Sequence, residues 1–478
     1  MDEPTRAEDL PPVIQGGMGV AVSGWELARA VASTGQLGVV SGAALDVVHV
    51  RRLADGDPGG HLRRAYATFP VAAIAEEVLE RWFIDGGRDP DQPYRPAPMF
   101  TTRPTPLQAG LTALANYAEV WLAKDGHGGP VGVNYLEKIQ VPTPYAAYGA
   151  LLAGVDAVLM GAGIPAQVPR LLDALARGEE TSYRVDVEGA TAPAEVHLDP
   201  AELLSRRPPV LRRPPFLAIV ASHTLAAYLA KDPATRPDGV VIEGPTAGGH
   251  NAPPRGKPRL DDRGQPVYGP RDGVDLDVID GLGLPFWLAG GHSTSGALAA
   301  ARMTGAKGIQ VGTAFALCAE SGLDHDLKAS AIAAGLAGRL EVTTDPLASP
   351  SGYPFKIAGI DQTLSQPAIH EARERVCDLG FLRTAFERPD GTVGFRCPSE
   401  PVERFTAKGG GATATQGRMC LCNGLTAAVG LGQTRSSGEE PALVTLGDDA
   451  GAVIGALASP DRGDWTAADV VEHLLAAP

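Results

Sequence analysis

Short apolar segments alternate with longer helix-like segments over the first 340 residues of the chain. Eight apolar segments have the length and the aliphatic content of buried strands. They cover residues 12–15, 37–40, 130–134, 157–160, 216–220, 240–243, 286–289 and 308–311. Since strands that alternate with helices form parallel sheets, the pattern predicts an α/β fold.

The segments between the strands predict helices. Ser23-Gly24-Trp25-Glu26 predicts a capping box that opens a helix ending near Ser33. Residues 45–128 are mostly helical in pattern, with a proline-rich break at 89–106. Further helices are predicted at residues 144–152, from Pro165 onward, and at 295–303.

Two parts of the chain depart from this alternation. Residues 177–213 interrupt it, and segments 183–187 and 194–198 predict a hairpin. After residue 340 the alternation stops; loops, a helix within 361–377, a hairpin at 386–396 and a terminal helix at 464–475 are predicted. We therefore predict a barrel domain of residues 11–340 with an insertion at 177–213. An appended α+β region of residues 341–478 packs on it.

Both a doubly wound sheet and a (β/α)₈ TIM barrel match eight strands alternating with helices. The candidate functional residues follow the first, third, sixth, seventh and eighth strands. A barrel gathers the ends of all its strands in one mouth, whereas an open sheet concentrates its ligand at one switch point. The spread of candidates favours the barrel.

Composition narrows the classes of function. The chain has 478 residues, 59 glycines and a formal net charge of −15. The acidic balance argues against nucleic acid or an anionic membrane as a partner. Residues 1–10 have no apolar core, and no apolar segment approaches the roughly 20 residues that span a bilayer. We expect a cytoplasmic protein.

The segment Gly244–His250 follows the sixth strand and places an imidazole beside the glycine pair Gly248-Gly249. A histidine there can move a proton near neutral pH, which makes His250 the candidate catalytic residue. The alternative is a structural or surface histidine, as most of the ten histidines are expected to be.

Two glycine-containing turns follow the last two strands. Gly290-Gly291 and Gly312-Thr313 offer backbone N–H groups to an anion, and barrel enzymes often bind phosphate after strands seven and eight. Either turn alone is a weak signal, because glycines end strands in many proteins. Together they favour phosphate binding.

The ends of the first and third strands suggest a site for a flat ring. The segment Gly16-Gly17-Met18 could form a glycine-lined floor for such a ring, and Gln15 and Asn134 carry amides for hydrogen bonds. A tight turn, and a buried asparagine that satisfies a loop, are the alternatives.

The sequence leaves the roles of several other groups open. Lys138 and Lys356 lie in polar loops, where either could meet an anionic substrate, but we interpret both as solvated. Residues 251–271 are interpreted either as a substrate lid or as a surface loop. Cys377, Cys397, Cys420 and Cys422 are candidate zinc or iron–sulfur ligands, but their spacing favours free thiols and we predict no metal.

Four motifs carry a family resemblance: Ile14–Gly19, Ala247–His250, Leu288–Gly291 and Ile309–Phe315. As a set they resemble the nitronate monooxygenase family, also known as the 2-nitropropane dioxygenase family, over roughly residues 11–335. That family is similar to FMN-dependent enoyl-acyl carrier protein reductases. Three features depart from its pattern: Thr246 where glutamate is frequent, a long loop after His250, and a C-terminal region that contains Cys420–Asn423.

The resemblance implies a (β/α)₈ barrel with one non-covalent FMN, and His250 falls on the family's catalytic histidine. The implied cofactor-binding residues are Gln15, Gly16, Gly17, Met18, Asn134, Gly248, Gly249, Gly290, Gly291, Gln310, Gly312 and Thr313. Of these, Gly290, Gly291, Gly312 and Thr313 are expected at the phosphate.

Three functions follow as hypotheses. The first is oxidation of alkyl nitronates with O₂ to a carbonyl compound and nitrite. In this oxidation His250, with a pKa of about 6.5, deprotonates a nitroalkane or stabilises its anion. The second is an NAD(P)H-dependent, trans-acting enoyl reductase of fatty acid or polyketide biosynthesis, served by an acyl carrier protein. The third is a non-catalytic flavin-binding protein. The other expected partners are a small-molecule substrate and a second copy of the chain in a homodimer.

Overall fold

The computed structural model describes residues 6–458 and 464–476. Eight parallel strands form one sheet in the order β1-β11-β10-β9-β8-β4-β3-β2. Their bounds are β1 Val13–Gln15, β2 Gly38–Ser41, β3 Val131–Leu136, β4 Ala157–Gly161, β8 Phe216–Val220, β9 Gly239–Glu243, β10 Phe286–Ala289 and β11 Gly308–Val311. All eight predicted strands are confirmed, with ends shifted by at most two residues.

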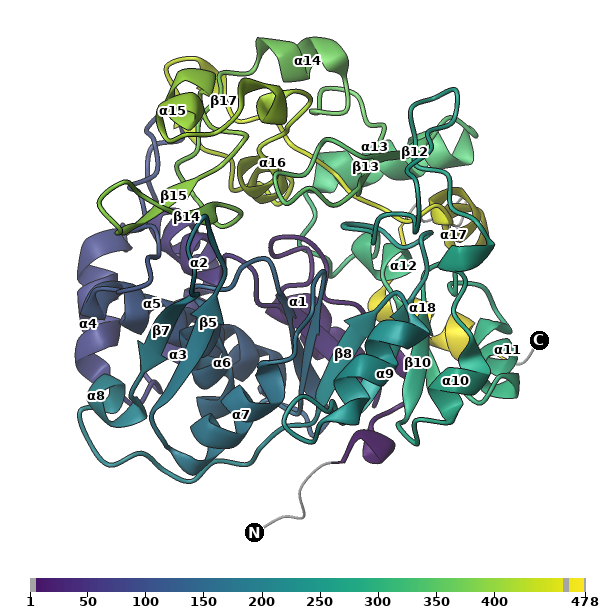
Figure 1. Ribbon diagram of the computed structural model, residues 1–478, viewed down its shortest axis with the longest axis horizontal. Helices are drawn as coiled ribbons and strands as arrows, with labels where there is room; N and C mark the ends of the chain where they lie inside the picture. Colours follow the sequence, from purple (N-terminus) through teal and green to yellow (C-terminus); the bar gives the residue numbers. More distant parts are fainter. Residues whose placement is uncertain (1–5, 459–463, 477–478) are drawn as a thin grey trace.

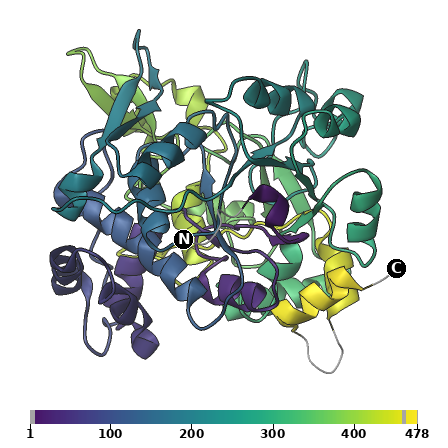
Figure 2. The ribbon, with the colours of Figure 1, turned by 90° about the horizontal axis from the view of Figure 1, so that it is seen from below.

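The first and last strands of that order meet and close the sheet into a barrel. The amide of Gln15 donates to the carbonyl of Leu37 at 3.0 Å, and the amide of Leu37 donates to the carbonyl of Val13 at 3.1 Å. The pair Ile14 and Leu37 is a parallel bridge. The predicted TIM-type barrel is confirmed, and Figure 2 shows it from below with helices around it.

Side chains alternate between the barrel interior and the surrounding helices. One buried cluster fills the interior, and the larger one lies between strands and helices. The interior cluster contains Ile14, Leu37, Val39, Leu159, Leu217, Ile219, Val241, Trp287 and Ala289. Because successive side chains of a strand point to opposite faces, this set fixes which strand-end residues face the barrel mouth.

The helices of the barrel part match the predicted pattern, with two corrections. α1 begins at Trp25 after Gly24, so the capping box is wrong; the Ser23 hydroxyl instead accepts from the Met18 amide at 2.9 Å. α7 begins at Val168 and not at Pro165. The elements are α1 Trp25–Ser33, α2 Leu45–Ala54, α3 His61–Tyr66, α4 Ala72–Trp82, α5 Pro106–Lys124, α6 Thr143–Leu152, α7 Val168–Arg177, α8 Pro200–Leu204, α9 His223–Lys231, α10 Leu276–Asp280, α11 Ala297–Met303, α12 Thr313–Ala316 and α13 His325–Leu336.

The insertion joins the barrel to the C-terminal region. Its predicted hairpin is confirmed as β5 (Thr181–Val185) and β7 (Ala194–Leu198). Between them, β6 (Val187–Glu188) pairs in parallel with β14 (Thr384–Glu387). β14 and β15 (Val393–Arg396) form the second predicted hairpin, which lies above β5 and β7 in Figure 1.

The rest of the C-terminal region covers the upper end of the barrel in Figure 1 and then returns to its side. Strands β12 and β13, which pair with each other, were not predicted from the sequence pattern. The elements are β12 Val342–Asp345, β13 Phe355–Ala358, α14 Pro367–Ala372, α15 Val402–Ala407, α16 Leu421–Ala427, β16 Thr434–Arg435, β17 Gly438–Glu439, α17 Ala450–Leu457 and α18 Ala467–Leu475. The Trp465 indole before α18 donates to the carbonyl of Ala314 at 2.8 Å. The proposed domain boundary stays a prediction.

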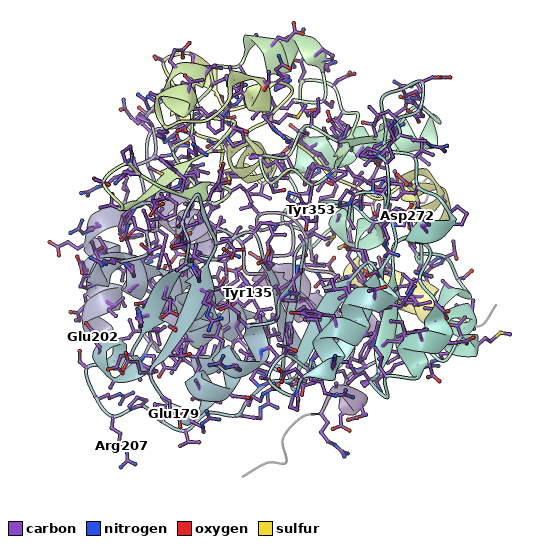
Figure 3. All side chains as sticks on the ribbon, in the orientation of Figure 1. Tyr135, Glu179, Glu202, Arg207, Asp272 and Tyr353 are labelled. Atoms are coloured by element: carbon purple, nitrogen blue, oxygen red, sulfur yellow. The ribbon has the colours of Figure 1, made fainter. Side chains whose placement is uncertain are left out.

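Several charged side chains lie at the periphery. Figure 3 shows Glu179, Glu202 and Arg207 at the outer edge of the molecule, whereas Tyr135 lies inside it and is 5% exposed. Within residues 6–458 and 464–476, no helix is both long and apolar enough to cross a bilayer. The N-terminal residues 1–5, part of the segment predicted to lack a signal, lie outside the described residues.

A buried hydrogen bond between a histidine and a glutamate ties α2 to α5. His49 Nε2 lies 2.8 Å from Glu119 Oε2, and both side chains are completely buried. Glu119 also accepts from the Trp25 amide at 2.8 Å. Burial pushes the pKa of Glu119 upward, but the hydrogen bond from His49 and the charge of Arg52 hold it below its ordinary value.

We predict that Glu119→Ala lowers the free energy of unfolding by about 3 kcal/mol or more, because it leaves buried donors without their acceptor. A carboxylate with a lowered pKa stabilises the fold above its ordinary pKa of about 4.5, and this contribution is lost as the pH falls through the lowered value. Urea unfolding of Glu119→Ala and the parent at pH 7 measures the loss, and unfolding of Glu119→Gln and the parent at pH 7 and pH 4 measures its pH dependence. The control Glu341→Gln, in an exposed pair with Arg263, should cost less than about 1 kcal/mol. Equal losses in Glu119→Ala and Glu341→Gln would contradict the prediction.

Candidate active site

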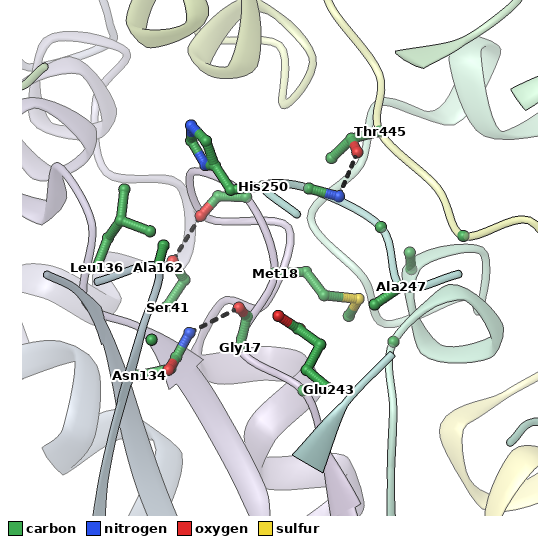
Figure 4. A pocket seen from close by; sticks show the side chains of 18 of the residues that line it. Gly17, Met18, Ser41, Asn134, Leu136, Ala162, Glu243, Ala247, His250 and Thr445 are labelled. Atoms are coloured by element: carbon green, nitrogen blue, oxygen red, sulfur yellow. Dashed lines mark hydrogen bonds between the residues drawn. The ribbon is translucent and has the colours of Figure 1, made fainter. Parts of the chain in front are cut away.

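The barrel mouth opens into a cavity of about 230 Å³, shown from close by in Figure 4. It brings together all but one of the predicted site residues. Those that line it are Gly16, Gly17, Met18, Asn134, Gly248, Gly249, His250, Gly290, Gly291, Gln310, Gly312 and Thr313. Gln15 does not line it.

Strand alternation explains which polar side chains face the mouth. Val241 lies in the interior cluster, so Glu243, two residues further along β9, points the same way. Ile309 and Val311 pack on the helix side, which turns Gln310 inward. The same rule turns Asn134 of β3 toward the barrel interior, since Val131 and Val133 face the helices.

Two of these groups carry acceptors that no described residue satisfies. The amide nitrogen of Asn134 donates to the carbonyl of Gly17 at 3.1 Å, but its Oδ1 is buried without a partner. Gln310 Oε1 is likewise buried without one. A buried unpaired acceptor is costly, so both suit a ligand that brings N–H donors.

Glycine is required where the β1 turn approaches β3. A Cβ on Gly17 would lie 2.3 Å from the Asn134 Cβ. A floor without side chains lets a flat ligand lie close to the backbone.

Gln15 has a different task from the predicted one. Its Oε1 accepts from the Val39 amide at 2.8 Å, and its Nε2 donates to the Ser23 hydroxyl at 2.8 Å. The side chain is completely buried. It holds the β1 turn against β2, so the geometry does not support contact with a ring in the cavity.

The predicted phosphate cradle is glycine-rich but carries an acidic neighbour. Gly290 and Gly291 have φ of +88° and +75°, which favours glycine at both positions. The residues that line the cavity include no lysine or arginine, whereas Asp449 lines it and accepts from the Ser293 hydroxyl. An anion would therefore depend on backbone N–H groups, with Asp449 opposing it.

The C-terminal region supplies one wall of the cavity, which was not predicted from the sequence. The Thr445 hydroxyl accepts from the Gly249 amide at 2.7 Å, and the Asp448 amide donates to the Thr246 carbonyl at 3.0 Å. The Gly447 amide donates to the Thr313 hydroxyl at 2.9 Å. Segment 445–449 thus crosses the mouth beside the glycine turns. In the sequence, the only sign of this wall was a Gly-Asp-Asp segment before a helix.

His250 lies on the far side of the cavity from the strand ends in Figure 4. Its Nε2 is 2.7 Å from the Ser349 hydroxyl, and its ring packs edge-on to Phe355 with centroids 4.9 Å apart. Burial, together with the positive charge of Lys138, lowers the pKa of His250 to about 4. The imidazole is therefore neutral at pH 7 and a weaker base than its ordinary pKa of about 6.5 implied.

Lys138 and Lys356 differ in their exposure to solvent. Lys138 is 34% exposed, pairs with Glu137 at 3.4 Å and lies over the Tyr353 ring. Lys356 is 2% exposed and pairs with Asp448 at 2.7 Å, so its interpretation as a solvated lysine is wrong. Only Lys138 is placed to act on an anion near His250.

Glu243 is a second titratable group at the mouth, and it was not predicted from the sequence. Its side chain lines the cavity. Among the described residues, none forms a hydrogen bond or an ion pair with its carboxyl group. Burial raises its pKa to about 7. An acidic residue at an inward position of a strand end was the signal that could have found it.

The remaining candidates lie apart from the cavity or lack metal geometry. Residues 251–271 line neither the cavity at the mouth nor the two smaller cavities beside it, which favours a surface loop. Of the four late cysteines only Cys422 lines the cavity at the mouth. In the described part of the chain, no three His, Cys, Asp or Glu side chains are grouped to hold a metal ion. A hydrogen bond with Cys397 and burial raise the pKa of the Cys377 thiol.

The family model for nitronate monooxygenase matches residues 213–350, which contain His250 and both glycine turns. The resemblance to nitronate monooxygenases is confirmed. Members of that family are typically flavin-dependent oxidoreductases, and the matched residues hold strand-end turns that line the barrel mouth of this chain. A search of curated proteins finds no match.

Several solved structures are similar to the whole chain at low identity. The enoyl reductase domain of MlnA, from the macrolactin biosynthesis cluster of Bacillus amyloliquefaciens, is 11% identical with a TM-score of 0.50, covering 96% of this chain and 92% of that one. FabK from Thermotoga maritima is 16% identical with a TM-score of 0.46, covering 97% and 91%. Nitroalkane oxidase from Streptomyces ansochromogenes is 17% identical with a TM-score of 0.44, covering 98% and 95%. At this level the likeness to the MlnA domain supports the fold alone.

We predict that His250 titrates with a midpoint near pH 4, measured by NMR of histidine-labelled protein and assigned with His250→Gln. Because Lys138 contributes to the lowering, Lys138→Gln should raise the midpoint, and Lys257→Gln in the exposed loop should not. A midpoint near 6.5 in the parent would show that the ring is solvated.

Proposed function

We propose that the protein is an FMN-dependent oxidoreductase that oxidises alkyl nitronates with O₂. The observation that carries the proposal is a neutral histidine beside a lysine, opposite unpaired amide acceptors in the glycine-lined mouth of a barrel. The match of residues 213–350 to the nitronate monooxygenase family supports it.

The residues at the mouth fit a flavin. The Gly16-Gly17 floor offers a flat surface, and the free acceptors of Asn134 and Gln310 suit ring N–H groups. The turns at Gly290-Gly291 and Gly312-Thr313 would hold the phosphate through backbone N–H groups. When bound, FMN supplies the electron transfer between nitronate and O₂.

An anionic substrate suits the groups on the other wall. The Lys138 charge attracts a nitronate, and the neutral His250 donates an N–H to one of its oxygens. A base with a pKa of about 4 removes a proton from a neutral nitroalkane poorly, so His250 stabilises the preformed anion. In net terms each nitronate gains one oxygen atom and yields a carbonyl compound and nitrite, so one O₂ serves two nitronates.

A reductase of enoyl thioesters is the second candidate. In that function NAD(P)H recharges the flavin, and an acyl carrier protein presents the substrate. A second cavity beside the mouth, lined partly by apolar side chains, favours this alternative because it has room for a longer substrate. A flavin-binding protein without turnover is the remaining alternative.

Anaerobic reduction of the FMN-loaded protein separates the three functions. We expect ethyl nitronate to bleach the visible flavin absorbance within seconds, and NADPH to leave it unchanged. Bleaching by NADPH alone would support the reductase, and no response to either would support the non-catalytic protein. Failure to bind FMN in fluorescence titrations would end the proposal.

We predict that His250→Ala raises KM for a nitronate about tenfold or more, because a charge-assisted hydrogen bond to the anion is lost. Lys138→Gln should raise KM similarly, and the effect of Lys138 should shrink at high salt because the residue is partly exposed. Steady-state oxygen consumption measures both, with Lys257→Gln as the control. Unchanged KM in His250→Ala would remove His250 from substrate binding.

A further inference from the structure

Three adjoining cavities lead from the barrel mouth toward the β14–β15 hairpin. The second has a volume of about 200 Å³, and a third, of about 20 Å³, lies between it and the mouth. Ile139 and Phe381 line all three. Ala44 and Leu136 are shared by the first and third, and Asp46 by the second and third. The shared walls place the cavities in a row that continues the active site.

The second cavity is built from parts of the chain that are far apart in sequence. The loop between β3 and α6 forms one wall, the segment 97–100 another, and residues 379–385 with Phe395 a third. Hydrogen bonds from Arg383 to the carbonyls of Gly380 and Phe100, both at 2.8 Å, hold two of these walls together. Because separate segments form its walls and hydrogen bonds fix two of them, the cavity is a defined part of the fold and not a surface irregularity.

Asp46 is the unusual group in this cavity. It is 7% exposed, and its carboxylate accepts hydrogen bonds from the Val47 amide, at 2.9 Å, and from its own backbone amide. No ion pair involves it in the described part of the chain. Burial raises its pKa to about 6, so it is mostly ionised at pH 7. Its place in the first turn of α2 offsets part of the cost of burial, but its other acceptor positions stay unfilled.

The charged side chains around the second cavity limit the chemical groups that can bind Asp46. Lys138 and Arg383 line the same space and disfavour an ammonium group. Asp186 lines it too, and with Asp46 disfavours a carboxylate. A neutral hydroxyl or amide N–H satisfies the carboxylate without meeting either repulsion.

We propose that the second cavity is a subsite for the tail of an extended substrate, in which a neutral O–H or N–H donor on the tail binds Asp46. The reacting end of the same molecule then lies at His250. This inference rests on the proposed function and specifies its substrate class. It excludes small nitroalkanes as the molecules to which the site is best matched.

Three nitronates test the subsite. They are ethyl nitronate, a straight-chain nitronate long enough to reach the second cavity, and the same chain ended by a hydroxyl group. We expect kcat/KM for the hydroxyl-ended chain to exceed that for the methyl-ended chain about tenfold or more in the parent. Asp46→Leu should abolish this preference and leave kcat/KM for ethyl nitronate unchanged. Asp186→Asn, in the same cavity but exposed, should keep the preference.

A second variant protects the test against misfolding of Asp46→Leu. Ala97→Phe fills the cavity from its partly buried wall and should lower kcat/KM for both long chains, but not for ethyl nitronate. Equal kcat/KM for the two long chains in the parent, or an unchanged preference in Asp46→Leu, would overturn the subsite.

The outcome is separable from the failure of the proposed function. If no nitronate is turned over, the proposed function fails, and binding of the hydroxyl-ended nitroalkane is measured by thermal shift. Stabilisation of the parent that is lost in Asp46→Leu would still support the subsite. Equal shifts in both proteins would overturn it.

Discussion

Closure of the eight-stranded sheet is the constraint on which the rest of the structure depends. The hydrogen bonds between β1 and β2 at Gln15 and Leu37 turn an open sheet into a barrel with a single mouth. Once the sheet is closed, alternation decides which strand-end side chains share that space. Asn134, Glu243 and Gln310 meet there although they are far apart in sequence. Gln15 uses its side chain for the closure and is lost to the site.

Burial at the mouth shifts the pKa values of His250 and Glu243 in opposite directions. It lowers the pKa of His250 to about 4 and raises that of Glu243 to about 7. In both cases the neutral form is favoured, since a low-dielectric environment disfavours charge. At pH 7 His250 is therefore neutral and Glu243 is about half ionised, Asp449 is a further acidic side chain in the lining, and Lys138 at the edge of the cavity provides the cation.

Local patterns predicted the strands and the barrel, because apolar segments and glycine turns are properties of neighbouring residues. Eleven of the twelve cofactor candidates line the mouth, and for three of them, Gly248, Gly249 and Gln310, only the family resemblance implied that role. Contacts between distant segments were not predictable in this way. The bond of His250 with Ser349, the pairing of Lys356 with Asp448 and the wall at 445–449 depend on how the C-terminal region folds back. Ser23 was misassigned for a local reason, because its hydroxyl accepts from the nearby Met18 amide and so serves the β1 turn and not a helix.

The position of segment 445–449 has a consequence for how the protein is made. Ribosomal synthesis delivers the strands of the barrel first, and domains generally fold in that order. The wall that meets Gly249 and Thr313 emerges after all eight strands of the barrel. The nascent barrel therefore has an unfinished pocket until segment 445–449 emerges, and a ligand that needs all of its walls is captured only after that point.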